Sequence, residues 1–92
     1  MYFKRFWDEG RGDEFDDWGP SWWYLEMDSQ GDTSRVVQRY AGGQVLRYDE
    51  KHWNDSYGEL PDGGADLAEF AGYEIAAEEF EAAWALSALN RT

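Results

Sequence analysis

Only one segment of this chain has the periodicity of an amphipathic helix, and this limits the folds that are open to it. The segment runs from Glu74 to Leu89. Apolar or small residues recur there at the spacing of one helix face: Ala76, Phe80, Ala83, Trp84 and Ser87. Because one helix of about four turns covers only one face of a sheet, any sheet in this chain needs a second cover or keeps one face open.

Four shorter segments are typical of β-strands, since they are aromatic-rich or alternating and contain no proline. They are residues 2–7, 21–27, 33–40 and 44–48. Turn-forming residues at 28–32 and 41–43 join the last three segments, and such short connections favour antiparallel neighbours. The sequence therefore predicts an α+β fold, a four-stranded antiparallel meander sheet with one C-terminal helix packed on one face, in a single domain of residues 1–92.

Aromatic residues fall on both faces of the expected strands. In segment 21–27 one face holds Trp23 with Leu25 and Met27, which makes it the better core candidate, and the other face holds Trp22 and Tyr24. Two covers for the second face are open. Either the irregular segment 49–72 folds over it with its own aromatic and leucine side chains, or the rings stay partly exposed as a protein-binding surface, where Trp and Tyr supply much of the binding energy.

The connection at residues 8–20 is long for a compact domain, and loops of that length are often functional. It contains four neighbouring carboxylates that could offer oxygens to calcium or magnesium: Asp13, Glu14, Asp16 and Asp17. Their spacing differs from the calcium-binding loop of an EF-hand. A solvated acidic loop is the stronger interpretation, and we expect no metal site and no cofactor.

The net charge of −12 restricts the partners of the chain. Residues 49–92 carry eleven acids and two bases. Such a field repels nucleic acid and anionic membrane and attracts basic protein surfaces, although solubility alone is an equally good explanation. No apolar run is long enough to cross a bilayer or to form a signal peptide, so a cytoplasmic location is expected. The sequence does not decide the oligomeric state and leaves a homodimer open.

The residues give little support to catalysis. There is no cysteine, which excludes thiol chemistry, disulfides and thiolate-bound zinc. The single histidine, His52, has Asp49 and Ser56 nearby in sequence, but catalytic sets of this kind are defined by geometry and are rarely local. We therefore expect a protein that is not an enzyme.

The chain resembles a group of small, acidic bacterial proteins of uncharacterised function. The resemblance rests mainly on the aromatic segment Trp22-Trp23-Tyr24-Leu25-Glu26 and on the helical segment Glu78-Glu79-Phe80-Glu81 with Trp84. It implies little about activity beyond a link to toxin-immunity proteins. This chain departs from the pattern at Ala76, where such relatives have Ser or Thr, so the helix start lacks a capping side chain.

Three functions remain after these exclusions. The leading one is an acidic protein-binding module, most concretely an immunity or inhibitor protein that neutralises a basic bacterial toxin or nuclease. The alternatives are a nucleic-acid mimic that inhibits a DNA-binding protein, for which Glu74, Glu78 and Glu81 are the nearest approach to a row of acids, and a small-ligand-binding domain. The residues expected to form the protein-binding surface are Trp22, Tyr24, Asp49, Glu50, Trp53, Asp55, Tyr57 and Glu59.

Overall fold

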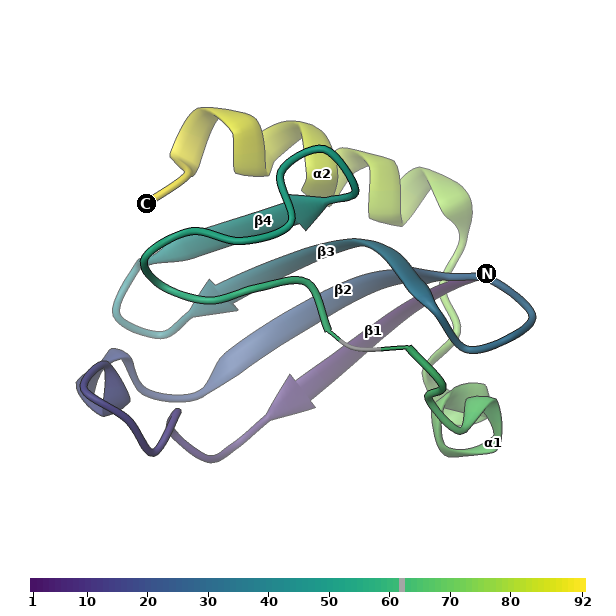
Figure 1. Ribbon diagram of the computed structural model, residues 1–92, viewed down its shortest axis with the longest axis horizontal. Helices are drawn as coiled ribbons and strands as arrows, with labels where there is room; N and C mark the ends of the chain where they lie inside the picture. Colours follow the sequence, from purple (N-terminus) through teal and green to yellow (C-terminus); the bar gives the residue numbers. More distant parts are fainter. Residues whose placement is uncertain (62) are drawn as a thin grey trace.

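The computed structural model, which describes residues 1–61 and 63–92, confirms the α+β fold with an antiparallel meander sheet (Figure 1). The strands lie side by side in chain order. They are β1 (Tyr2–Trp7), β2 (Ser21–Met27), β3 (Thr33–Tyr40) and β4 (Val45–Asp49). The C-terminal helix α2 (Ala77–Asn90) packs on one face of the sheet, as the apolar stripe of this segment predicts.

Strand register divides the side chains between two faces, which we call the helix face and the loop face. Two rows of residues that are paired across the strands define them. The row on the helix face is Lys4, Tyr24, Val37 and Arg47. The row on the loop face is Phe3, Leu25, Val36 and Tyr48. Because side chains alternate along a strand, these two rows assign most of the remaining strand residues to a face.

On the helix face, Phe80 and Ala83 of α2 are buried against Tyr24 and Val37. The helix begins three residues later than the predicted Glu74. Its N-cap residue is Ala76, which has extended dihedral angles and makes no side-chain capping bond, as expected of an alanine at this position. No helix in the described part of the chain is both long and apolar enough to span a bilayer.

On the loop face, residues 50–61 and 63–70, which follow β4 and which we call the crossing segment, supply the second cover. This segment crosses in front of the sheet in Figure 1 and places partly buried side chains on a core of buried strand residues and Trp18. These side chains are Tyr57, Leu60, Ala65, Leu67 and Phe70. The crossing segment thus covers a sheet face as the first alternative expects, but it covers the face of Leu25 and Met27, whereas α2 covers Tyr24. The larger of the two hydrophobic cores lies under this irregular cover.

The prediction that residues 49–72 are irregular throughout is wrong near their end. Residues Leu67–Phe70 form the short helix α1, followed by a 3₁₀ turn at Ala71–Tyr73. The helix begins there because the side chain of Asp66 accepts a hydrogen bond from the backbone N–H of Ala68 at 3.0 Å, which caps its first turn. Phe70 of α1 then reaches the ring of Phe3, with a centroid distance of 5.6 Å.

Both outer strands of the sheet are paired in part with non-strand backbone. On β1, the carbonyl of Tyr2 accepts a hydrogen bond from Ile75 N–H at 2.9 Å. On β4, Val45 pairs with Thr92, whose N–H donates to the Val45 carbonyl at 2.8 Å. The two ends of the α2 segment thus protect opposite edges of the sheet, which limits edge-to-edge association.

Candidate functional site

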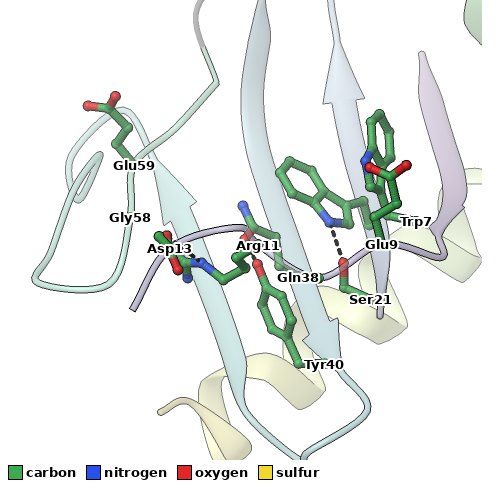
Figure 2. Close-up of a pocket in the computed structure, with 11 residues that line it drawn as sticks. Trp7, Glu9, Arg11, Asp13, Ser21, Gln38, Tyr40, Gly58 and Glu59 are labelled. Atoms are coloured by element: carbon green, nitrogen blue, oxygen red, sulfur yellow. Dashed lines mark hydrogen bonds and ion pairs between the residues drawn. The ribbon is translucent and has the colours of Figure 1, made fainter. Parts of the chain in front are cut away.

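A cavity of about 370 Å³ opens on the loop face, where β1 ends and β2 begins; we call it the end cavity (Figure 2). Three parts of the chain line it: the end of β1 with the loop after it, the strands β2 and β3, and the crossing segment at Gly58 and Glu59. Its volume lies at the lower end of the range of small-molecule sites, about 300–1,000 Å³. The cavity can therefore hold one side chain or one small group.

Two tryptophans form the apolar wall of the end cavity. Trp7 ends β1 and Trp23 lies on β2, and their ring centroids are 5.9 Å apart. The indole N–H of Trp23 donates to the hydroxyl of Ser21 at 2.8 Å, which fixes the orientation of that ring. Trp7 remains 43% exposed. A pair of indoles that is half open to solvent can stack on a planar or cationic group.

The floor of the cavity is polar. Gln38 is only 5% exposed, and its amide oxygen accepts a hydrogen bond from the Tyr40 hydroxyl at 2.7 Å. Burial raises the pKa of Tyr40, so the hydroxyl keeps its proton. The amide nitrogen of Gln38 forms no hydrogen bond within the described residues. One end of a buried amide is thus left for whatever occupies the cavity.

The one cation of the wall, Arg11, is already engaged. Its Nε donates to Asp13 at 3.2 Å, and one terminal nitrogen donates to the carbonyl of Tyr57. The guanidinium also lies over the rings of Phe15 and Trp18, about 5 Å from each centroid. The other terminal nitrogen is buried and has no hydrogen-bond partner among residues 1–61 and 63–92. Because that nitrogen has no exposed surface, a ligand in the cavity cannot reach it.

The accessible charges at the rim are therefore negative. Glu9 and Glu59 line the cavity from opposite sides of its mouth (Figure 2). Both side chains are exposed, and neither takes part in an ion pair among the described residues. Asp13 also lines the cavity but shares its charge with Arg11. The arrangement suits a cation or a hydrogen-bonding neutral group better than an anion.

The residues expected to form one binding surface are spread over the molecule. Trp22 lies on the helix face beside Phe6, with ring centroids 5.0 Å apart, and is 41% exposed. Trp53 is exposed on the crossing segment. The expectation that Tyr24 is an exposed anchor is wrong, because Tyr24 is 5% exposed under α2. Tyr57 is half-buried and packs on Phe15 and Trp18.

The expected acidic residues also separate. Asp49 accepts hydrogen bonds from the backbone N–H groups of Lys51 and His52 and so shapes a turn. Asp55 is half-buried, and although burial opposes ionisation, bonds from the Tyr48 hydroxyl and two backbone N–H groups lower its pKa. Glu50 is exposed. Of the expected set, only Glu59 lines the end cavity.

The geometry does not assemble the catalytic or metal sites considered for the sequence. The ring of His52 contacts Arg91, and no hydrogen bond joins it to Ser56 within the part of the chain that is described. No cluster of potential metal ligands occurs among residues 1–61 and 63–92. In the acidic loop, Asp13 accepts a bond from Phe15 N–H and Asp16 one from Gly12 N–H. These carboxylates shape the loop.

Several residues of the end cavity have no place in the surface expected from the sequence. The strand pattern predicts Trp23 in the core, because it shares a strand face with Leu25 and Met27. Trp23 is partly buried and packs against that core, and it also lines the end cavity. The sequence signal that points to this region is the length of the connection 8–20, which supplies Glu9, Arg11 and Asp13.

Comparisons of the chain with protein families, with curated protein sequences and with solved structures find no match. The resemblance to small acidic bacterial proteins therefore stays a hypothesis, and a function for the chain has to be inferred from its own geometry.

Proposed function

We propose that the protein is a binding module for a basic protein. The observation that carries this proposal is the internal use of its cations. Bases that form ion pairs with the protein's own carboxylates are Lys4, Arg11, Arg35 and Arg91. Contacts of this kind leave few positive groups to oppose the acidic field outside.

Two of the remaining bases, Arg5 and Arg47, lie over aromatic rings of the same chain, whereas Arg39 and Lys51 are exposed. Arg47 lies 3.8 Å from the ring centroid of Trp84, and burial lowers its pKa. Arg5 lies over Trp7 and Tyr73, and Arg39 donates to the hydroxyl of Tyr24. By contrast, exposed acids such as Glu9 and Glu59 form no ion pair within the described residues. With Arg39 and Lys51 as the exposed bases outside these ion pairs and a net charge of −12, the outward charge available to a partner is predominantly negative.

The partner that fits this charge is a basic protein. In its most concrete form, the proposal is that this chain is an inhibitor or immunity protein that covers the basic active site of a toxin or nuclease. Electrostatic steering of this kind raises association rates by roughly 10–10³. Nucleic-acid mimicry is less well supported, because it needs a regular row of free acids. Glu81, at the end of the only candidate row, is paired with Arg35 at 2.7 Å.

The test is surface plasmon resonance with the immobilised protein and a panel of purified basic nucleases and toxins, at increasing salt. We expect at least one partner whose association rate falls steeply as sodium chloride rises, because screening weakens steering. Neutral and acidic proteins of similar size serve as controls. Absence of binding across the panel, or association rates indifferent to salt, would contradict the proposal.

A further inference from the structure

We propose that the end cavity is a recognition site for a single arginine side chain of the basic partner. The inference rests on the proposed function, because it names the group through which a basic protein would be recognised. It is carried by the cavity geometry: two indoles, two unpaired carboxylates and one half-satisfied buried amide around a space of about 370 Å³.

The charge of the cavity selects a cation. Arg11 is the only base in the lining, and its reachable nitrogens already donate to Asp13 and Tyr57. An anion would therefore meet Glu9 and Glu59 without a free positive group to offset them. A cation would gain from both carboxylates and from the faces of the indoles.

The shape of the lining favours a guanidinium over an ammonium. A guanidinium is planar, stacks on aromatic faces and points its N–H groups outward in its own plane. In the end cavity it would stack on the indole wall of Trp7 and Trp23, with its edge toward the carboxylate of Glu9, which lies beside Trp7 (Figure 2). An ammonium is compact and strongly hydrated, and it lacks the planar face and the fan of N–H groups that let a guanidinium stack and reach several acceptors at once.

After the indoles and the carboxylates, Gln38 is the third group of the lining that can contact a guanidinium. A hydroxyl both donates and accepts hydrogen bonds, so Tyr40 can bond either end of the Gln38 amide. When the amide nitrogen turns toward Tyr40, its carbonyl oxygen faces the cavity as an acceptor for a guanidinium N–H. In that orientation Gln38 adds an acceptor to the carboxylates of the lining, while the Tyr40 hydroxyl accepts from the amide nitrogen in place of donating to the amide oxygen.

The other exposed apolar groups do not form a comparable site. Trp22 and Phe6 stack on each other on the helix face, with Lys4 at 4.9 Å from the Trp22 ring. Trp7 likewise has Arg5 at 5.0 Å from its ring, but it also pairs with Trp23 and shares the end cavity with Glu9 and Glu59. Leu86 borders a second hollow beside Arg39, where no carboxylate lines the space. The combination of indoles and free carboxylates distinguishes the end cavity.

The experiment uses three short fluorescent peptides with lysines around one central residue, which is arginine, citrulline or lysine. Citrulline keeps the shape of arginine without its charge. Fluorescence anisotropy gives the affinity of each peptide for the full chain at low and physiological salt. We expect the arginine peptide to bind about tenfold more tightly than the citrulline peptide and about threefold more tightly than the lysine peptide.

Matched variants locate the preference. Trp7→Ala is expected to reduce the tenfold preference for the arginine peptide over the citrulline peptide to about twofold or less. Trp22→Ala removes an equally exposed indole from the helix face and should leave this preference unchanged. Glu59→Gln should reduce it about threefold, and Glu50→Gln, with the same change of charge outside the cavity, should not. Circular dichroism checks that each variant is folded. If Trp7→Ala is unfolded, Trp7→Phe takes its place and is expected to keep part of the preference for arginine.

Two failures are distinguishable. If no peptide binds and no basic protein binds at any salt, the proposed function fails and this inference fails with it. If basic partners bind with the expected salt dependence but arginine, lysine and citrulline peptides are equivalent, or Trp7→Ala keeps the full preference, the end cavity is not an arginine site while the proposed function stands.

Discussion

The two faces of the sheet are closed in different ways. On the helix face a regular element, α2, seals Tyr24 and Val37 with the buried side chains of Phe80 and Ala83. On the loop face the cover is assembled from the connection between β1 and β2 and from the crossing segment after β4. This cover encloses the larger core. Each cover leaves a hollow of about 370 Å³ at its margin, but among the described residues only the lining of the hollow on the loop face combines indoles with carboxylates.

The difference shows where specificity can be built in a small domain. A helix presents one continuous stripe, so its contact with the sheet is uniform along its length. The loops bring isolated side chains such as Glu9, Gln38 and Glu59 to one point from distant parts of the chain. Binding groups are commonly placed on loops that a rigid scaffold holds in position, and here the scaffold is the sheet.

The largest expected effect is on the helix face. Phe80 is fully buried, and Phe80→Ala should lower the free energy of unfolding by about 3–5 kcal/mol because it opens a cavity under α2. Urea denaturation measures the change. Phe6→Ala removes an exposed ring that contacts Trp22 and should cost less than about 1.5 kcal/mol. Similar losses in the two variants would mean that α2 does not seal this face.

The matching change on the loop face is Gly31→Ala. Gly31 has a φ of +81°, and a Cβ there would overlap the backbone of Ala65 in the crossing segment. We expect a loss of about 1–3 kcal/mol together with loosening of that segment, seen in hydrogen exchange. Gly43→Ala has a comparable positive φ but open space around it. A Gly43 variant that loosens the crossing segment as much would refute the role given to Gly31.

A smaller effect is the pH dependence of an ion pair on the helix face. Arg35 donates to Glu26 on the helix face at 2.7 Å and 2.9 Å and holds the pKa of Glu26 at about 2. Since the carboxyl of an unfolded chain titrates near about 4.3, this pair stabilises the fold above that pH, and the gain is lost as pH falls toward 2.

Glu26→Gln should therefore lower the free energy of unfolding at neutral pH by about 1 kcal/mol, a value discounted for solvent screening. The free energy of unfolding of this variant should also fall less between neutral and acid pH than that of the unaltered protein. Denaturation at a series of pH values checks this. Glu78→Gln, at an exposed carboxyl on α2, is the control. An unchanged acid limb in the Glu26 variant would show that the pair contributes nothing.

The smallest effect is a gain. Ala76 is the N-cap of α2, its dihedral angles already suit a capping residue, and Glu79 stands three positions later. Ala76→Ser should add about 1 kcal/mol of stability, because the hydroxyl can accept a bond from the N–H at Glu79. Thermal unfolding measures the gain. Ala82→Ser, in the middle of the helix, should not stabilise, and equal gains in both would argue against capping.

The strands and the helix are predictable because each has a local pattern. The alternation in β2 and the stripe through Phe80 and Ala83 are visible in the sequence, and the structure confirms both. The end cavity is not predictable. It depends on the register that sets Gln38 opposite Trp23 and on the path of the segment that carries Glu59. The sequence misplaces Tyr24 because it does not tell which face α2 covers.

The most direct measurement is a nuclear magnetic resonance titration of the isotope-labelled protein with the arginine peptide. We predict saturable shifts of the indole N–H signals of Trp7 and Trp23 and of the backbone at Glu59, with the signals of Trp22 and of α2 unmoved. Shifts centred on α2 or on Trp22, with the end cavity silent, would place the binding surface on the helix face and contradict an arginine site in the end cavity.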